Sequence, residues 1–475
     1  MPTTTNTAPL HKGAILTIVL VSYAMILLDN SVIFTGLPSL QADLGLTSTE
    51  LAWVQNAYTL LFGGLLLLGA RAGDILGRKP VFIFGLTVFS IASLLIAVSP
   101  AGWWIITARA IQGVGAAIVA PSALSLITVS FEGEERTRAV AWYSATAGIG
   151  ASLGLVIGGA AASWFSWRAG FFLNVPIGLA MLIAAPRFLP RTPALPGRFD
   201  IAGAITSTLG VGSLVFAILH AADAGWTSVP TIVGVIVAVI VLALFVVAEA
   251  RATQPIMPLR LFASRTRTGA YLVRMLYIGA MIGFFFFTSQ YLQDALGFTP
   301  LQAGVAFLPM TLVNFAVAVA IPRLTARFGN SAVLLAGTAL TVAGMTWLSH
   351  ITPTSDYLTA VALPMVLIGA GQGLAFAPMT TFGIAGATAQ DAGAASGVVN
   401  TFHQVGSSLG LGILVAVGAA AARGERGDRA ATITAEASAA LGTASAFLLC
   451  SFLITLALIL PAARRTIATH NRTDH

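Results

Sequence analysis

Four ionisable side chains stand out because each lies inside a long apolar stretch of the sequence. They are Asp29, Arg109, Arg274 and His403. A charged group at the centre of a bilayer is unfavourable by about 3 kcal/mol or more, so such a residue marks a functional site by default. A carboxyl group in apolar surroundings can also gain and lose a proton near neutral pH. We therefore expect Asp29 to carry protons, and the alternative is a structural role in which it caps a polar patch or forms a static pair with Arg109.

The two arginines allow more than one interpretation. Arg109 lies about six residues inside its apolar stretch, and its side chain either faces the protein interior or reaches the lipid headgroups. Arg274 lies at a similar depth, and there we expect the side chain to extend to the membrane surface.

Motifs for ATP-driven transport and for hydrolysis are absent or misplaced. A phosphate-binding loop ends in Gly-Lys-Ser/Thr, whereas the only two lysines, Lys12 and Lys79, precede Gly13 and Pro80. Residues 150–154 and 406–410 both read Gly-x-Ser-x-Gly, but they lie within long apolar stretches rather than in the strand–turn–helix that a catalytic serine requires. Small residues at this spacing favour close helix packing. With no paired carboxylates at a shared depth and no metal-ligand spacing, we expect neither an enzyme nor a cofactor.

The composition shows what kind of element must position these residues. Of 475 residues, 57% are hydrophobic and 9% are charged, against about 25% charged in soluble domains. Apolar stretches of about 20 residues recur along the chain, as membrane-spanning helices require. The sequence predicts an all-α integral membrane protein with fourteen spans, at 14–36, 51–70, 80–98, 103–127, 137–160, 169–186, 201–220, 230–250, 268–290, 302–320, 331–350, 358–381, 391–419 and 438–462.

The basic residues indicate the orientation of these spans. Most of the 24 lysines and arginines fall on the side of the two termini, and those on the other side are Arg168, Arg423, Arg426 and Arg429. By the positive-inside rule, both termini are cytoplasmic and the protein is a multi-pass protein of the cell (inner or plasma) membrane. The basic residues lie in short breaks between apolar stretches without a basic stripe, so we expect membrane lipids and no nucleic acid as partners.

Two halves of the chain resemble each other. The glycine-rich segment 150–154 matches 406–410, Arg71 and Gly77 match Arg323 and Gly329, and Pro121 matches Pro378, all at offsets of about 255 residues. Parallel repeats of this kind are typical of transporters with a binding site near the bilayer midplane. We predict a six-helix bundle at 1–186, linkers and two inserted helices at 187–267, a second, pseudo-symmetric six-helix bundle at 268–462, and a cytoplasmic tail at 463–475.

The loop at 71–79, Arg-Ala-Gly-Asp-Ile-Leu-Gly-Arg-Lys, resembles the signature loop of the major facilitator superfamily. Further segments are similar to the fourteen-helix drug:proton antiporters of that superfamily, the quaternary-ammonium and multidrug efflux type. These segments are 28–33, 37–38, 53–58, Arg109 with 112–115, 167–168 with 174–176, 290–293 with 303–304, and 396–401. Two positions depart from the pattern, since Ala70 and Leu155 stand where glycine and proline are usual.

The resemblance implies roles for particular residues. Asp29 would carry the proton, and an inward-facing Arg109 would tune its release. The loop would close the cytoplasmic side by binding the start of the span at 391–419, where we expect Asp391 to cap the helix and to meet Arg78 or Lys79. The gating residues would be Gly73, Asp74, Gly77, Arg78, Lys79 and Asp391, and the antiporter-helix glycines Gly150, Gly154, Gly158 and Gly159.

The remaining candidates concern coupling and the substrate. Exchange of one monovalent cation for one proton moves no net charge, so use of the membrane potential would need a second titratable site, and His403 is the candidate. The alternative is that His403 is a packing residue. We expect a substrate cavity lined by Asn30, Tyr58, Tyr277, Phe284, Gln290, Asn400 and Gln404.

The sequence therefore predicts a proton-coupled antiporter that exports lipophilic or cationic drugs by alternating access. A second interpretation is a dedicated exporter of one endogenous natural product or lipid. A third, from another class, is a membrane sensor that transports nothing.

Overall fold

The computed structural model describes residues 11–461 except 195, 198, 389–390 and 426, and in these residues every regular element is a helix. The predicted tail at 463–475 lies outside them. The N-terminal helices are α1 Lys12–Leu44, α2 Ser48–Leu76, α3 Arg78–Ala97, α4 Gly102–Ser130, α5 Gly133–Trp164, α6 Trp167–Phe172 and α7 Asn174–Phe188. Next come α8 Ile201–Ala224, α9 Val229–Arg251 and the short η1 Leu259–Ala263. The C-terminal helices are α10 Arg265–Gln290, η2 Tyr291–Ala295, α11 Pro300–Ala306, α12 Leu308–Leu348, η3 Leu358–Ala362, α13 Leu363–Ile384, α14 Ala392–Ala422, α15 Arg429–Ile454 and η4 Thr455–Ile459.

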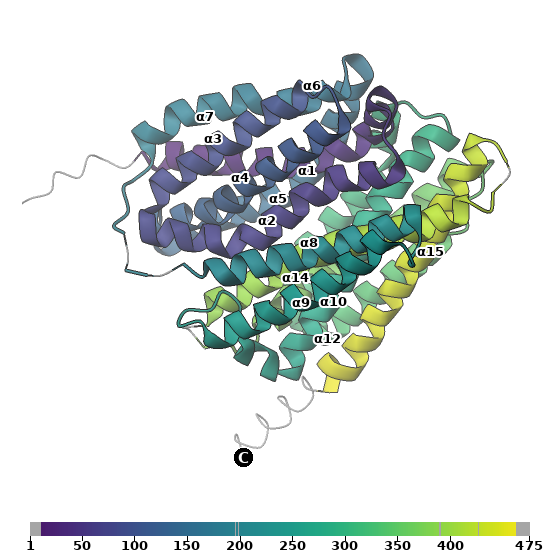
Figure 1. The fold of residues 1–475 in the computed structure, drawn as a ribbon. Helices are drawn as coiled ribbons and strands as arrows, with labels where there is room; N and C mark the ends of the chain where they lie inside the picture. The colour runs from purple at the N-terminus through teal and green to yellow at the C-terminus, as the bar shows by residue number, and fades with distance from the viewer. Residues whose placement is uncertain (1–10, 195, 198, 389–390, 426, 462–475) are drawn as a thin grey trace, which may run out of the picture.

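The long helices run side by side, so the body has two ends (Figure 1). The chain turns between α1 and α2 at Gly45, where φ is 63°, and between α2 and α3 at Gly77, where φ is 91°. Only glycine adopts these conformations without strain. We call the two ends of the body the Gly45 end and the Gly77 end. At the Gly45 end, α2 begins with a capping box in which Thr47 and Glu50 exchange hydrogen bonds of 3.1 and 2.9 Å.

The number of spans differs from the sequence-based prediction. Twelve helical segments in the described part of the chain are long and apolar enough to cross a membrane, whereas the sequence predicted fourteen. The predicted span 137–160 falls in α5, of which only Leu153–Trp164 counts as a shorter apolar helix. The predicted spans 302–320 and 331–350 merge into one segment, Pro300–Leu348, because the chain stays helical on both sides of a kink at Gly329. A multi-pass, all-helical membrane protein is confirmed.

Glycines bring the N-terminal helices into close contact. A Cβ on Gly113 of α4 would lie 2.4 Å from the Tyr58 carbonyl oxygen of α2, and one on Gly115 would lie 2.6 Å from the Phe89 nitrogen of α3. In α5, a Cβ on Gly158 would lie 2.7 Å from Val32 Cα of α1. Such distances are too short for any side chain, so these helices pack backbone to backbone.

The C-terminal helices use the same device. A Cβ on Gly410 of α14 would lie 2.2 Å from Gly279 Cα of α10, and one on Gly406 would lie 2.2 Å from the Met275 carbonyl oxygen. A Cβ on Gly369 of α13 would lie 2.2 Å from the Met310 carbonyl oxygen of α12. The contact of α14 with α10 therefore parallels that of α5 with α1.

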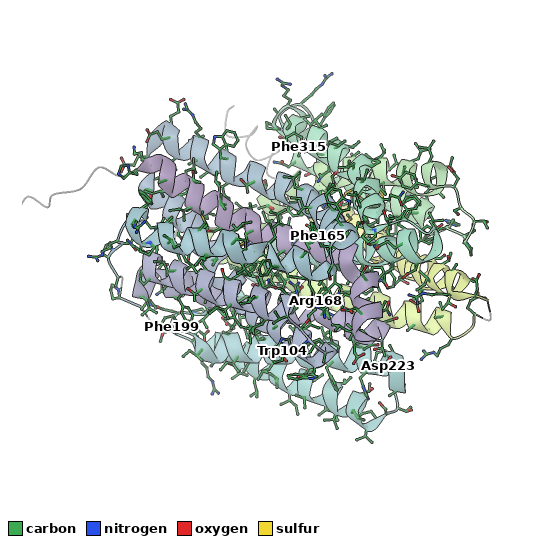
Figure 2. All side chains as sticks on the ribbon, turned by 90° about the horizontal axis from the view of Figure 1, so that it is seen from above. Trp104, Phe165, Arg168, Phe199, Asp223 and Phe315 are labelled. Atoms are coloured by element: carbon green, nitrogen blue, oxygen red, sulfur yellow. The ribbon has the colours of Figure 1, made fainter. Side chains whose placement is uncertain are left out.

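The inserted helices α8 and α9 lie beside both sets (Figure 1). Helix α8 packs on α2 and α14, while α9 packs mainly on α8. At the Gly45 end, Thr49 of α2 donates a 2.9 Å hydrogen bond to Asp223 of α8, which Figure 2 labels. Arg168 at the start of α6, also labelled there, donates to the Asp43 carboxylate and, over 2.9 Å, to the Ser99 carbonyl oxygen.

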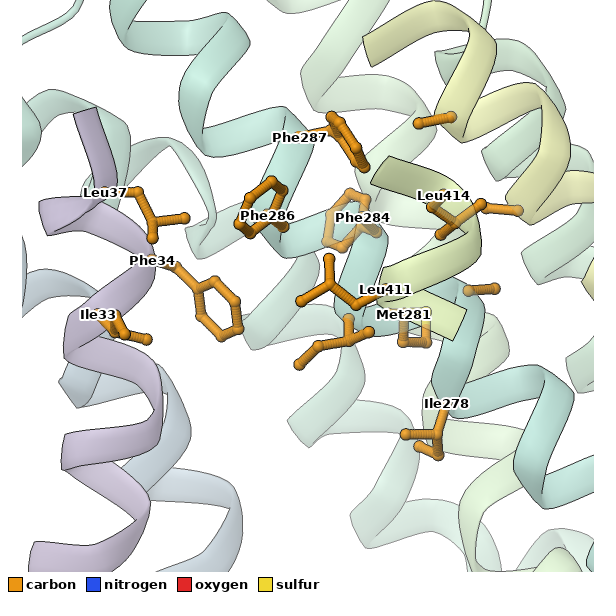
Figure 3. Close-up of a cluster of buried hydrophobic side chains, with 14 of the residues drawn as sticks. Ile33, Phe34, Leu37, Ile278, Met281, Phe284, Phe286, Phe287, Leu411 and Leu414 are labelled. Atoms are coloured by element: carbon orange, nitrogen blue, oxygen red, sulfur yellow. The ribbon is translucent and has the colours of Figure 1, made fainter. Parts of the chain in front are cut away.

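The two sets of helices meet directly at the Gly45 end. Ser289 and Gln293 donate hydrogen bonds of 2.6 and 3.2 Å to the carbonyl oxygens of Phe34 and Thr35, and the Leu301 amide donates to Ser163 over 2.8 Å. Figure 3 shows the apolar part of this contact, where Phe34 of α1 faces the phenylalanine run of α10 and two leucines of α14. The Gly45 end is therefore closed.

We expect Gly113→Ala to lower the thermal unfolding temperature of the purified protein. The added methyl group meets the α2 backbone, which cannot move alone, and overpacking of this kind costs about 1–3 kcal/mol. Gly412→Ala is the matched control, because the nearest atom to its Cβ would be 3.8 Å away. Equal unfolding temperatures for the two variants would contradict the backbone packing described here.

Candidate functional site

The Asp29 carboxylate is buried in α1 and accepts three hydrogen bonds from other helices. The donors are Arg109 Nη1, Gln112 Nε2 and Asn174 Nδ2, which lie 2.7, 2.8 and 2.7 Å from the carboxylate oxygens. Arg109 and Gln112 belong to α4, and Asn174 begins α7. The residue is 1% exposed. Three donors around one carboxylate stabilise its ionised form, while burial favours the protonated form, so the environment can support either state.

Arg109 is fully buried, and its donors are well used. Besides Asp29, it donates to Gln112 Oε1 at 2.6 Å and to the Val54 carbonyl oxygen at 3.1 Å, and its guanidinium lies 4.2 Å from the centre of the Tyr58 ring. The alternative of a side chain that reaches the headgroups is therefore wrong. The two opposite charges neutralise each other inside the protein, which is what allows both to stay buried.

Several partners of this pair lie in segments that carry the family resemblance, 53–58, 112–115 and 174–176, but the sequence analysis gave them no role. Gln112 lies one helical turn from Arg109 on the same face of α4, a spacing that could have identified it. Asn174 sits where the helix breaks between α6 and α7, and no periodic pattern marks it. Gln55 donates to the predicted cavity residue Asn30 at 3.1 Å and accepts from Arg109 at 3.4 Å.

The predicted gating loop binds the N-terminal helices and the linkers that follow α7 and α9, and Arg71 donates to Gln254 of the second linker over 2.5 Å. Arg78 contacts Asp74 at 3.4 Å and donates to the Ser125 carbonyl oxygen of α4 at 3.1 Å. Lys79 donates to the carbonyl oxygens of Pro186 and Leu189 at 2.6 and 2.9 Å. Gly77 forms the turn, and a Cβ on Gly73 would meet only Ser122 and Arg78 at ordinary distances.

Asp391 has a different partner from the one predicted. Its carboxylate accepts two hydrogen bonds, at 3.1 and 2.6 Å, from Arg260 of the linker helix η1, and it makes no side-chain cap on α14. The prediction of a contact with Arg78 or Lys79 is wrong for this conformation, because Arg260 occupies both oxygens. These hydrogen bonds hold the pKa of Asp391 below its usual value. The ion pair is therefore present at neutral pH and is lost only as the pH falls through that lowered pKa.

The predicted antiporter-helix glycines of α5 divide into two groups. Gly150, Gly154 and Gly158 face α1, and a Cβ on Gly154 would lie 2.6 Å from Ser31 Cβ, two residues beyond Asp29. Gly159 instead faces the C-terminal helices, where a Cβ would lie 2.4 Å from the Pro300 carbonyl oxygen. One helix thus contacts both the Asp29 helix and the opposite half.

Several predicted cavity residues are packed inside the protein in this conformation. Tyr277 shares a 2.8 Å hydrogen bond with Thr341, Phe284 packs edge-on against Phe307, and Gln290 donates to a carbonyl oxygen of its own helix. These three are buried by packing among the C-terminal helices. Tyr58 lies over Arg109, and Asn400 is exposed on α14. Gln404 borders a cavity of about 30 Å³ between α2, α8 and α14.

Arg274 and His403 lie on the same aromatic ring, that of Phe376 in α13. The Arg274 guanidinium is 3.8 Å from the ring centre, and the His403 ring meets it edge-on at 6.1 Å. The predicted extension of Arg274 to the membrane surface is wrong, because α13 covers its side chain and leaves it 4% exposed. His403 Nδ1 is buried without a hydrogen-bond partner.

Residues 19–411 match the family model of the Major Facilitator Superfamily. The chain belongs to this superfamily. It is a multi-pass membrane transporter and not an enzyme.

Among similar proteins, the transporter is 39% identical over 404 residues to a cephamycin export protein of Amycolatopsis lactamdurans, covering 83% of each chain. It is 36% identical to a puromycin resistance protein of Streptomyces alboniger, covering 86% of this chain and 82% of the relative. It is 32% identical to a tetracenomycin C resistance and export protein of Streptomyces glaucescens, covering 84% and 75%. These relatives are named for antibiotic export or resistance.

Solved structures of the same fold include a peptide transporter bound to alafosfalin, with a TM-score of 0.69, 12% identity and coverage of 95% of this chain and 94% of that one. The human organic anion transporter MFSD10 gives a TM-score of 0.62 at 18% identity, covering 94% and 99%. At these identities the likeness concerns the fold.

We expect Gly159→Ala to weaken closure of the Gly45 end. The new methyl group would collide with the Pro300 backbone, and the collision is relieved when α5 and α11 separate. A cysteine in place of Leu301, which is half-buried beside α5, should then react faster with a membrane-impermeant thiol reagent in Gly159→Ala than in the Gly412→Ala control. Identical labelling rates would contradict a role for this glycine in closure.

Proposed function

We propose that this transporter is a proton-coupled antiporter that exports lipophilic and cationic drugs by alternating access. The observation that carries the proposal is the buried Asp29–Arg109 pair, because it links a protonatable carboxylate on α1 to two other helices, α4 and α7. Relatives named for antibiotic export and resistance support export as the direction of transport and drugs as the substrates.

The topology we propose has fourteen crossings. The segment Pro300–Leu348 has 49 residues, about 73 Å of helix at 1.5 Å per residue, which is too long for one crossing of a core about 30 Å thick. Gly329, with φ 78° and ψ 155°, is the natural point of division. Helix α5, with 32 residues, is long enough for another crossing. The matching glycine contacts of α5 with α1 and of α14 with α10 support two related six-helix bundles flanking the pair α8 and α9.

We place the Gly77 end and both termini in the cytoplasm, because most of the basic residues lie at that end. With this orientation the closed Gly45 end is the outer side, and we propose a conformation shut toward the outside. Helices α2 and α14 also touch nearer the Gly77 end, where Leu67 lies against Gly397. The loop at 71–79 contacts the N-terminal helices and, through Arg71 and Gln254, the linker that leads to the C-terminal helices. Its closure onto the start of α14 would require Arg260 to leave Asp391.

Coupling follows from the electrostatics of the buried pair. A proton on Asp29 removes the charge that compensates Arg109, and breaking a buried ion pair in this way costs about 3–5 kcal/mol. The helices that carry the two residues, α1 and α4, then favour an arrangement in which Arg109 finds other acceptors. Substrate that reaches the same network favours the ionised carboxylate and expels the proton. Competition of this kind is sufficient for antiport.

His403 remains a candidate second proton site. Its imidazole contacts Phe376 and meets no carboxylate among the described residues. We therefore assign the essential step to Asp29 and Arg109.

Two other functions make different predictions. A dedicated exporter of one natural product or lipid would use the same machinery but would accept a single chemical class. A sensor without transport activity would bind ligands without moving them across a sealed membrane. Uptake of several unrelated compounds into vesicles distinguishes both from a multidrug antiporter.

We expect Asp29→Asn to abolish uphill transport of the lipophilic cation tetraphenylphosphonium into proteoliposomes under an imposed pH gradient. The amide resembles a permanently protonated carboxyl group and cannot exchange a proton. Asp29→Glu should retain partial transport. Glu134→Gln is the control, because it removes an exposed carboxylate on α5 far from the pair. Accumulation by Asp29→Asn at the rate of this control would show that the proton carrier lies elsewhere.

A further inference from the structure

Arg274 differs from Arg109 in how its charge is compensated. Both guanidinium groups are buried, but Arg109 has a carboxylate at 2.7 Å. Arg274 makes no ion pair within the described residues, and its two hydrogen bonds, to the Phe376 carbonyl oxygen and to Thr380 Oγ1, are both 3.4 Å long and both use Nη1. Its Nε is buried without any partner. A guanidinium has five N–H donors, so most of its capacity is unused.

The surroundings of Arg274 supply further unused polar atoms and aromatic faces. The Phe376 ring packs against the Arg274 guanidinium and also contacts the His403 imidazole. The Nδ1 atom of that imidazole is buried without a hydrogen-bond partner. One turn away on α10, the Tyr271 hydroxyl is also buried without a partner. Buried polar groups are normally satisfied, and a cation buried without a counter-charge is the most costly exception. A ligand that brings an anion and an apolar body would satisfy both the donors and the rings.

We propose that Arg274 binds the carboxylate of lipophilic acidic substrates at the junction of α10, α13 and α14. Arginine presents two parallel N–H donors that match a carboxylate, and Phe376 offers a flat apolar surface beside them. Arg274 lies nine residues into α10, about 13 Å from the Gly77 end, and its contacts are on α13, whereas the Asp29 network joins α1, α4 and α7. The inference rests on the proposed export function and names a class of cargo for it.

The charge balance of transport changes with such a cargo. Export of a monovalent carboxylate against one entering proton moves two positive charges inward in total. The membrane potential therefore drives the exchange without a second proton site. This differs from the exchange of a monovalent cation for one proton, which moves no net charge.

Three probes test the site in purified protein without any ion gradient. Naproxen carries an aryl group and a carboxylate, naproxen methyl ester carries the same aryl group without charge, and tetraphenylphosphonium is a cation. Binding is measured by quenching of tryptophan fluorescence. Arg274→Gln should weaken naproxen binding about tenfold or more, as expected for loss of charge-assisted hydrogen bonds, and should leave ester binding within about twofold. Arg274→Lys should retain intermediate affinity for naproxen.

The matched control is Arg265→Gln, which removes a charge from the exposed start of the same helix and should change none of the affinities. The unfolding temperature of Arg274→Gln shows whether this variant is still folded. If it is not, the affinities of Arg274→Lys for naproxen and its ester decide the test. Equal losses for acid and ester, or no loss for either, would overturn the proposal.

Anionic lipid headgroups share the chemistry of the carboxylate, so binding is repeated with added phosphatidylglycerol or phosphatidylcholine. Equal naproxen affinity in both lipids supports a substrate site. Displacement of naproxen by phosphatidylglycerol from the wild type and not from Arg274→Gln would assign the site to lipid and overturn the proposal. Because these assays need no transport, their failure is distinguishable from failure of the antiport mechanism.

Discussion

The ion pair between Asp29 and Arg109 constrains the N-terminal half more than any other polar contact. Neither charge can remain buried alone, so α1, α4 and α7 must keep the positions that satisfy the pair. Two of these helices are also held closely by other neighbours through glycines, since α4 reaches α2 at Gly113 and α5 reaches α1 at Gly158. Backbone packing and the ion pair thus favour the same arrangement of helices. Protonation of Asp29 removes the attraction to Arg109 and leaves only the packing.

The two halves of the transporter use similar packing for different electrostatics. Helix α14 meets α10 through glycines as α5 meets α1, but the buried arginine of the C-terminal half has an aromatic ring and long neutral contacts in place of a carboxylate. Arg109 in the N-terminal half is neutralised by Asp29, whereas Arg274 in the C-terminal half has no carboxylate partner among the described residues. We infer that the two halves have different functions. We assign the proton to the first and the acidic group of a substrate to the second.

Much of this could be predicted from the sequence, and the failures have physical causes. Composition and apolar stretches were sufficient for an all-helical membrane protein, and the loop at 71–79 was sufficient for the family, because both signals are local. The burial of Arg274 was missed because the expected reach to the surface assumes lipid beside the helix, whereas α13 lies there. Asn174 was missed because its contact with Asp29 joins residues 145 positions apart. The partner of Asp391 depends on the path of a linker, which no periodic pattern describes.

The most direct test of the account is proton release by the purified transporter in weakly buffered detergent solution. Addition of tetraphenylphosphonium should release protons from the wild type, detected by a pH indicator dye, and should release none from Asp29→Asn. Release that is unchanged in Asp29→Asn would contradict the assignment of Asp29 as the site where proton and substrate compete.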